Sequence, residues 1–420
     1  MQTQMGPKRP RHGLGPEFLK LWAASAVSNV GDGVTVVAAP LLAASLTRDP
    51  LLVAGLAFAV QLPWLLFSLV SGAIVDRLDR RIVMGAVAAF RSALIGVLGL
   101  AVLADAASMP LLYGVFFLLG AAETVFDPAS VTVLPTIVPR EGLPKANARL
   151  AGTSTVLNVF VGPPLGGFLF AAAAALPFLL AGASFAAACA LVLALRGTFR
   201  VERGEDAPPT RLRGEIAEGV RWLARHRLLR SMALALGIMN LTMAAWNSIL
   251  VLFATERLGL GPRGFGLLLS AYALGGTAAS AVAHQIITRL GPGRTLRIGL
   301  LIEAGTAMVL ALTGEPYVAD AVFALFGFHA IVWGTLSISL RQELIPPALL
   351  GRVNSAYDMI GKGTSALGVV VGGLLAAYFG LVSPFWFAAS GMTLLTLVVW
   401  PVFRDSTIVG AQRDAAERAA

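Results

Sequence analysis

The chain has 420 residues, of which 57% are hydrophobic and 13% charged, and its formal net charge is +9 at pH 7. An average soluble domain has roughly 45–50% apolar and about 25% charged residues, so a soluble protein with one buried core is excluded. The composition predicts an all-α integral membrane protein, whose spans each need about 20 apolar residues to cross a hydrocarbon layer ~30 Å thick.

The chain contains enough apolar runs for twelve transmembrane helices. If consecutive spans alternate in direction, 27 of the 32 Lys and Arg residues fall on the side of both termini. Because positive residues stay in the cytoplasm, we predict a multi-pass protein of the plasma (cell inner) membrane with both termini cytoplasmic. The spans are 18–45, 51–75, 82–104, 110–132, 149–173, 176–196, 231–254, 264–287, 296–313, 317–339, 354–379 and 384–403.

A basic stretch divides the spans into two groups of six. Residues 1–17 form a cytoplasmic N-terminal segment that lacks the short apolar core of a cleavable signal, so the first span is expected to remain in the mature protein. The other predicted parts are a six-helix bundle at 18–196, a basic linker with an amphipathic helix at 197–230, a second bundle at 231–403 and a short, polar, mobile cytoplasmic tail at 404–420.

The first bundle places ionisable residues inside its spans. Asp32 lies about 18 Å deep, counted from Lys20 at 1.5 Å per residue, and such residues are costly and commonly functional. Arg91 and Glu123 lie at similar depth on neighbouring antiparallel spans, with Asp127 one turn below. We predict that Asp32 couples transport to protons, with Arg91, Glu123 and Asp127 as a paired group. A structural hydrogen bond of Asp32 and a static Arg91–Glu123 pair are the alternatives.

The loop GAIVDRLDRR at 72–81 is predicted to be a gate element on the cytoplasmic side. A glycine lets a facing helix approach closely, and a carboxylate is stabilised at a helix N-terminus, here that of the helix starting near Asn354. A simple positive-inside anchor is the alternative. The gate residues are Gly72, Asp76, Arg77, Arg80 and Arg81.

The fifth span is predicted to be kinked and thin, because two consecutive prolines remove backbone donors and glycines leave a smooth face. Its pattern comprises Asn158, Gly162, Pro163, Gly166 and Gly167.

The two halves of the chain resemble each other. In the segments after the fourth and tenth spans, Pro139 and Asn147 match Pro346 and Asn354 at one offset. Repeated halves with a site between them are the architecture of alternating-access carriers.

The second bundle carries fewer candidate residues. Asp358 and Lys362 are four residues apart and are predicted to form a structural ion pair, whereas Glu303 has no evident partner. His329 is either a cavity residue or a satisfied core histidine. Candidate substrate-cavity residues are Asn29, Gln61, Asn240, Trp246, Asn247, His329 and Trp333.

These motifs resemble the major facilitator superfamily over nearly the whole chain. The 72–81 loop is similar to that family's G-x-x-x-D-R-x-x-R-R pattern. The fifth span is similar to the exporters' G-x-x-x-G-P-x-x-G-G pattern, with Asn158 in place of the first glycine. Segments 123–139 and 341–356 resemble the branch with enterobactin exporters and macrolide or multidrug efflux pumps. The resemblance implies two pseudo-symmetric six-helix bundles and proton-antiport export of a drug, macrolide or siderophore.

An enzyme is not expected, since phosphate-loop, H-E-x-x-H and G-x-S-x-G motifs are absent from the sequence. One cysteine, Cys189, and four histidines give no metal cluster, so no cofactor or metal is predicted. The expected partners are a small-molecule substrate, protons and the lipid bilayer, with no nucleic acid and a monomeric state. The alternatives are a proton-linked or facilitative importer of a small metabolite on the same fold, and a membrane sensor that does not transport.

Overall fold

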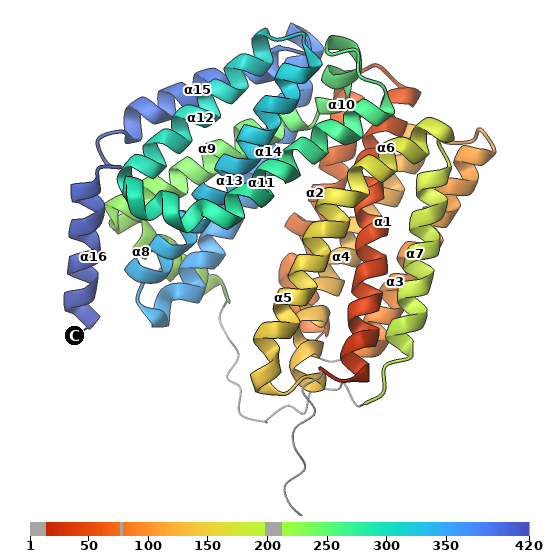
Figure 1. Cartoon of the computed structure of the whole chain (residues 1–420), viewed down its shortest axis with the longest axis horizontal. Helices are drawn as coiled ribbons and strands as arrows, with labels where there is room; N and C mark the ends of the chain where they lie inside the picture. The colour runs from red at the N-terminus through yellow and green to blue at the C-terminus, as the bar shows by residue number, and fades with distance from the viewer. Residues whose placement is uncertain (1–13, 76–78, 198–211, 420) are drawn as a thin grey trace, which may run out of the picture.

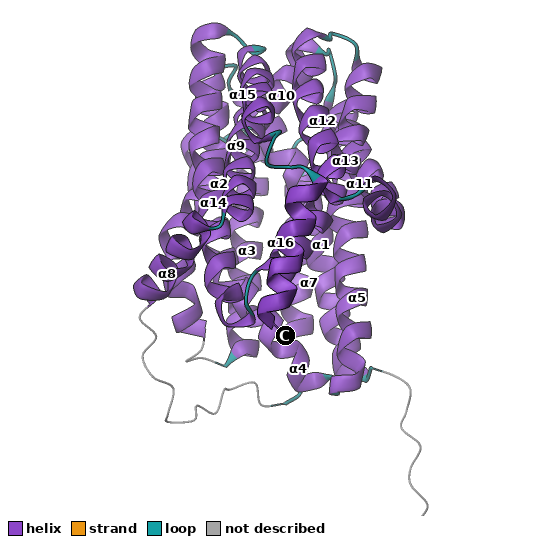
Figure 2. Cartoon of the chain, turned by 90° about the vertical axis from the view of Figure 1, so that its left-hand side faces the viewer, coloured by secondary structure: helices purple, strands orange, loops and turns teal. Residues whose placement is uncertain are grey.

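The computed structural model describes residues 14–75, 79–197 and 212–419, and within them no side-chain description is given for 68–75, 127–129, 131–132, 212–217, 348, 416, 418 and 419. The described residues form helices joined by short loops, with no strand among them (Figure 2). Eleven described helical segments are long and apolar enough to cross a membrane, and Ser383–Val399 is a shorter apolar helix. The predicted all-α, twelve-span fold is therefore confirmed.

The first six crossings use nine helical elements, because the fifth is divided into three and a short 3₁₀ turn precedes it. Helices α5, η2 and α6 follow one another directly as one span, which begins several residues earlier than predicted. The elements are α1 (Pro16–Leu46), α2 (Pro50–Val75), α3 (Arg80–Leu103), α4 (Met109–Ile137), the 3₁₀ turn η1 (Arg140–Gly142), α5 (Leu143–Ser154), the π-helix η2 (Thr155–Val161), α6 (Gly162–Ala172) and α7 (Leu176–Leu193).

The remaining six crossings follow a short amphipathic helix, as predicted for the linker. The elements are α8 (Leu212–Arg225), α9 (Arg227–Asn247), α10 (Leu250–Leu252), the π-helix η3 (Phe253–Arg257), α11 (Pro262–Leu290), α12 (Pro292–Leu312), α13 (Pro316–Leu344), α14 (Pro347–Phe379), α15 (Ser383–Val399) and α16 (Asp405–Ala419). Helix α8 packs on α14, where Arg352 Nη1 donates to Glu218 Oε2 at 2.6 Å.

The helices form two bundles, α1–α7 and α9–α15, that diverge like a V (Figure 1). The start of α1 and the end of α16 lie toward the open end, which we call the terminus side; the other is the far side. Across the bundles, α2 packs on α14 and α6 packs on α11. The structure is thus closed on the far side.

Backbone contact at glycines forms this closure. A Cβ built on Gly266 of α11 would lie 2.6 Å from the carbonyl oxygen of Pro163, and one on Gly373 of α14 would lie 2.8 Å from Cβ of Ala54. Neither position has room for a side chain, so small residues set the separation of the bundles, as they do between membrane helices. An exposed ion pair, Arg48 Nη1 to Glu256 Oε1 at 3.1 Å, also joins the bundles.

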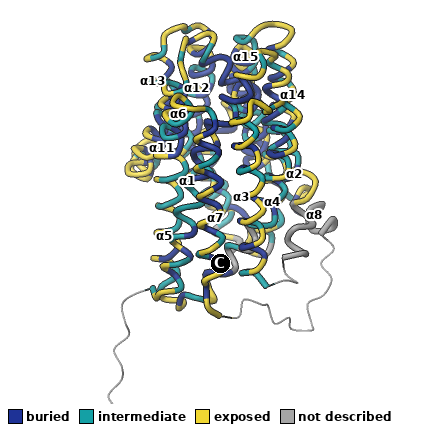
Figure 3. Tube along the Cα trace, turned by 90° about the vertical axis from the view of Figure 1, so that its right-hand side faces the viewer, coloured by how far each residue is buried: buried dark blue, intermediate teal, exposed yellow. Residues whose placement is uncertain are grey.

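Buried residues run through the interiors of both bundles and outward-facing positions are mostly exposed (Figure 3). The C-terminal segment is also packed, so the expectation of a mobile tail is wrong. Asp405 Oδ1 accepts a hydrogen bond from Gly293 N at 2.7 Å, Gln412 Nε2 donates to Glu343 Oε2 at 2.6 Å, and Ile408 is fully buried. These contacts dock α16 against the second bundle.

Candidate functional site

The centre of the candidate site is an ion pair between Asp32 on α1 and Arg91 on α3. Asp32 lies about 24 Å along α1 from Pro16, at 1.5 Å per residue, so it lies midway through the bundle. The Arg91 guanidinium is 8% exposed and its Cζ lies 4.2 Å from the centroid of the Phe185 ring. The pair combines charge attraction with a cation–π contact, both of which strengthen away from water.

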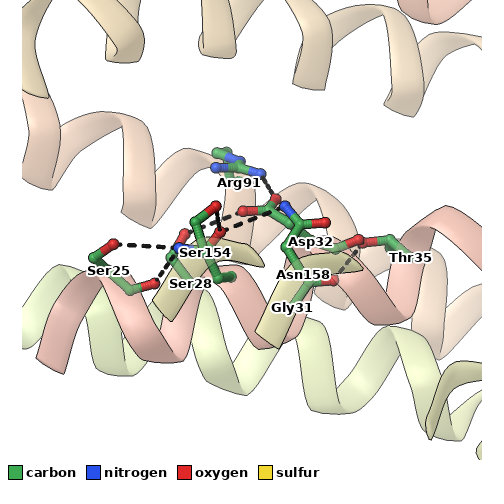
Figure 4. Close-up of polar contacts among 9 residues, drawn as sticks. Ser25, Ser28, Gly31, Asp32, Thr35, Arg91, Ser154 and Asn158 are labelled. Atoms are coloured by element: carbon green, nitrogen blue, oxygen red, sulfur yellow. Dashed lines mark hydrogen bonds and ion pairs between the residues drawn. The ribbon is translucent and has the colours of Figure 1, made fainter. Parts of the chain in front are cut away.

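Polar side chains from α1 and the fifth span surround this pair (Figure 4). Ser154 Oγ donates to Asn29 Oδ1 at 2.8 Å, and Asn158 Nδ2 lies 3.4 Å from the same oxygen. Asn29 Nδ2 donates to the carbonyl oxygen of Ser25 at 2.7 Å, which fixes its amide orientation. The network therefore holds the middle of the fifth span against α1 next to Asp32.

The π-helix η2 explains how Asn158 reaches this position. Pro163 and Pro164 have no N–H groups, so the regular i→i−4 ladder is interrupted. Gly162 N instead donates to Leu157 O, five residues earlier. The extra residue in this turn widens the helix, and such bulges recur at functional sites.

Glycines on both sides of the fifth span fit it between the bundles. A Cβ on Gly166 would lie 2.6 Å from the Val34 carbonyl oxygen of α1, and one on Gly162 would collide with Gly33. Gly167 faces Pro262 of α11 instead. The motif thus packs its own bundle and also forms part of the far-side closure.

Two cavities meet at the Asp32–Arg91 pair. One of about 540 Å³ is lined by first-bundle residues toward the terminus side, including Ser25, Asn29 and Asn147. The other, about 480 Å³, reaches the bundle interface and is lined by Gln61 and Asn247 among mostly apolar residues. Both share one set of wall residues: Asp32, Arg91, Glu123, Asn158 and Phe185.

The structure joins Asp32 to the predicted paired group. Arg91 pairs with Asp32, and the predicted pairing of Arg91 with Glu123 stays a prediction. Glu123 lines both cavities beside the pair. The side chain of Asp127 lies outside the described residues. The rotation of α1 and α3 about their axes, which sequence depth alone does not reveal, brings the Asp32 carboxylate to the guanidinium.

Three of the predicted cavity residues, Asn29, Gln61 and Asn247, line the cavities, as does Asn158 of the fifth-span pattern. Asn240 does not, and it donates to the Leu236 carbonyl oxygen at 2.9 Å.

Three other predicted cavity residues, Trp246, His329 and Trp333, are core residues of the second bundle in this structure, which for His329 is the second of the two expected roles. They are 6%, 3% and 7% exposed. Trp246 packs among aromatic rings, including Phe385, whose centroid lies 5.9 Å away. Large aromatic rings gain most from full burial, which is why an apolar helix face holds them inside.

His329 is the partner of Glu303, for which the sequence alone indicated none. His329 Nε2 lies 3.0 Å from Glu303 Oε2, and the two side chains are buried between α13 and α12. Buried polar groups need such partners. Because the residues are 26 positions apart on different helices, no local pattern indicated the pair.

The predicted ion pair between Asp358 and Lys362 is not formed. Lys362 Nζ instead lies 4.3 Å from the centroid of the Trp64 ring on α2. The four-residue spacing places both side chains on one face of α14, but the packing of α2 offers the lysine an aromatic ring.

The described residues include only part of the predicted gate loop. Asp76 and Arg77 lie outside the described residues, and Gly72 lies in α2. Asp79 caps α3 by accepting from Arg81 N at 2.9 Å, while Arg81 Nη1 donates to the Leu195 carbonyl oxygen at 2.8 Å. Arg80 begins α3. The predicted contact of this loop with the second bundle stays a prediction.

Sequence reasoning missed Ser25, Ser28, Ser154 and Phe185 as site residues. Ser25 and Ser28 precede Asp32 by seven and four residues, so helical spacing from an intramembrane carboxylate could have indicated them. Ser154 and Phe185 come from other helices, and only packing brings them to the site.

Comparisons with known proteins bear on the family to which the chain belongs. A profile of the family described as transmembrane secretion effector matches residues 15–408. The chain is 29% identical over 402 residues to the multidrug efflux pump Tap of Mycolicibacterium fortuitum, covering 91% of this chain and 95% of Tap. It is 28% identical over 394 residues to the enterobactin exporter EntS of Shigella boydii, covering 91% and 90%.

The fold is also that of solved transporters. A bacterial homologue of the iron transporter ferroportin in its inward-facing state superposes with a TM-score of 0.73 at 18% identity, over 93% of this chain and 99% of that one. The outward-facing structure gives 0.57 at 19% identity, over the same shares. With a family match over residues 15–408, the chain belongs to the transmembrane secretion effector family of major facilitator superfamily transporters.

Proposed function

We propose that this protein exports a small amphipathic organic compound in exchange for protons, by alternating access. The observation that carries the proposal is the Asp32–Arg91 pair, which forms part of the wall of both cavities. An ionisable pair at mid-depth that both cavities share can meet water from either side in turn. Intramembrane carboxylates in such positions serve as proton relays.

The proposed cycle follows from the charge of Asp32. In the state described, Asp32 pairs with Arg91 and the far side is closed, so the ionised carboxylate belongs to the state open toward the termini. With the termini in the cytoplasm, as the arginine distribution predicts, substrate binds in this state. After the bundles rock and the far side opens, the Asp32 carboxylate accepts a proton from that side and its attraction to Arg91 is lost. Return to the first state releases the proton into the cytoplasm.

The first bundle (18–196) and the second (231–403) are the bodies that rock in this proposal, around the cavities between them. The basic linker (197–230) joins them on the cytoplasmic side, and the protein acts as a monomer. An amphipathic substrate fits walls that are mostly apolar with amides from Asn29, Gln61, Asn158 and Asn247. The names of Tap and EntS favour a drug or a siderophore.

The test is transport in everted membrane vesicles, after growth of a deletion strain on a drug panel and on iron-limited plates has identified a substrate. Asp32→Asn is expected to abolish transport against a concentration gradient but to retain exchange of labelled for unlabelled substrate, because exchange needs no proton. The matched control is Asp320→Asn, since Asp320 lies on α13 and lines neither cavity.

Equal uphill transport by Asp32→Asn and the wild type would contradict the coupling role of Asp32. Uptake into intact cells driven by an inward proton gradient would instead support the importer.

A further inference from the structure

A third opening lies beside the central site, where the bundles meet. This side pocket has a volume of about 170 Å³ and is lined by Gln61, Trp64 and Leu65 of α2 and Lys362 of α14. Gln61 also lines the far-side cavity of about 480 Å³, so the two openings adjoin. The side pocket and the cavity are therefore neighbours on the two sides of Gln61.

Lys362 places a positive charge at mid-depth. It is 15 residues from Pro347 and 17 from Phe379, hence about 23 and 26 Å from the ends of α14 at 1.5 Å per residue. Its side chain is exposed, and so is that of Asp358 one turn away. An ammonium at this depth is costly unless an anion or polar group pairs with it.

The partner that the described protein offers to Lys362 is the face of Trp64, at 4.3 Å from Nζ to the ring centroid. A cation–π contact stabilises the side of the ammonium that faces the ring, and the N–H groups on its other side do not point at the ring. An ammonium has three donors, and an aromatic face does not replace the anion that a midplane charge needs. The geometry leaves one coordination side of Lys362 open to the pocket.

The second positive charge that lines these openings, Arg91, already has an anionic partner. Among the described residues lining the two cavities and the side pocket, the cations are Arg91 and Lys362. Arg91 pairs with Asp32. Lys362 is thus the available positive charge in the side pocket, which shares the wall residue Gln61 with the mostly apolar cavity.

We propose that Lys362, held by Trp64, binds the anionic group of the transported substrate. The apolar body of the molecule then occupies the adjoining cavity, where Gln61 and Asn247 supply amides. This inference rests on the proposed export function and specifies the substrate class as an amphipathic anion, carrying a carboxylate or a similar anionic oxygen. When the substrate binds, the Lys362 ammonium donates a charge-assisted hydrogen bond to the anionic oxygen of the substrate on the side that Trp64 does not cover.

The test measures equilibrium binding to the full chain in nanodiscs of zwitterionic lipid, without any gradient. The probes are dansyl-phenylalanine, which is an anion, and dansyl-phenylalaninamide, which has nearly the same size and no carboxylate. The wild type is expected to bind the acid at least tenfold more tightly than the amide. Lys362→Gln is expected to reduce that ratio below twofold, whereas Lys362→Arg retains it. The control is Lys145→Gln, since Lys145 is exposed on α5.

The ratio of the two affinities separates charge recognition from folding, because a misfolded variant loses both probes together. A wild type that binds acid and amide equally, or a Lys362→Gln variant that keeps the preference, would overturn the proposal. A lipid headgroup as the occupant would also overturn the proposal. In that case the wild type shows no preference for the acid in zwitterionic nanodiscs, and it retains bound anionic lipid that Lys362→Gln loses. Because no gradient is used, failure here leaves the Asp32→Asn transport result unaffected.

Discussion

Among the described residues, a buried or partly buried acid–base pair lies deep within each bundle, and these two pairs have different surroundings. Asp32 and Arg91 of the first bundle form part of the wall shared by two cavities. Glu303 and His329 of the second bundle are 6% and 3% exposed, and the adjacent void of about 10 Å³ has room for at most about one water. Access to water, rather than the presence of ionisable groups, distinguishes a pair that can exchange protons from one that stabilises packing.

The two bundles therefore have different roles. The first supplies the polar centre, with its carboxylate, guanidinium and amides. The second supplies a rigid aromatic and glycine-lined body against which the first closes. In our proposals it contributes a charge to the substrate only at its edge, through Lys362.

The largest expected effect is on the Asp32–Arg91 pair, which lines the cavities. Arg91→Gln removes the charge that pairs with Asp32, so uphill transport in vesicles is expected to fall at least tenfold, on the order of 1.4 kcal/mol or more. Transport rates are compared after normalising to folded protein measured by size-exclusion chromatography.

The sealed pair serves as the matched contrast. His329→Leu leaves the Glu303 carboxyl buried without its partner, which costs about 1–3 kcal/mol of stability. Thermal unfolding of the purified protein is expected to occur at lower temperature, while transport per folded molecule stays within twofold. Loss of transport in a stably folded His329→Leu variant would remove the distinction between the pairs.

A smaller effect is expected at the glycine contact of the far-side closure. Gly266→Val places methyl groups where a Cβ alone would lie 2.6 Å from the Pro163 carbonyl oxygen, so the bundles are pushed apart there. With Cys189→Ser as background and a cysteine at Asn247, labelling by an impermeant maleimide from the far side is expected to rise several-fold.

Gly305→Val is the control for this substitution, since a Cβ at Gly305 meets nothing within 4 Å. Unchanged labelling in Gly266→Val would show that other contacts hold the far side closed.

The smallest effect is expected at the ion pair that also joins the bundles. The side chains of Arg48 and Glu256 are 69% and 38% exposed, and exposed pairs contribute about 0–1 kcal/mol. Arg48→Ala is expected to change the same maleimide labelling by less than about fivefold at low salt, and by less still at high salt. A larger change in labelling would show that this ion pair, rather than the glycine contacts, mainly holds the far side closed.

Much of the architecture could be predicted because the signals are local. Apolar run length predicted the twelve spans, the two prolines after Gly162 predicted an irregular fifth span, and the cost of a midplane charge indicated Asp32 and Arg91. The C-terminal tail was mispredicted because its polar composition outweighed two anchoring residues, Asp405 and Ile408.

The sequence by itself determined how many times the chain crosses the membrane and which ionisable groups lie at mid-depth, since both depend on residues counted along one helix. Only the tertiary structure decided the partners: Arg91 with Asp32, His329 with Glu303, and Lys362 with Trp64. Helix rotation and bundle packing choose among groups of equal depth, and those depend on the whole set of contacting side chains.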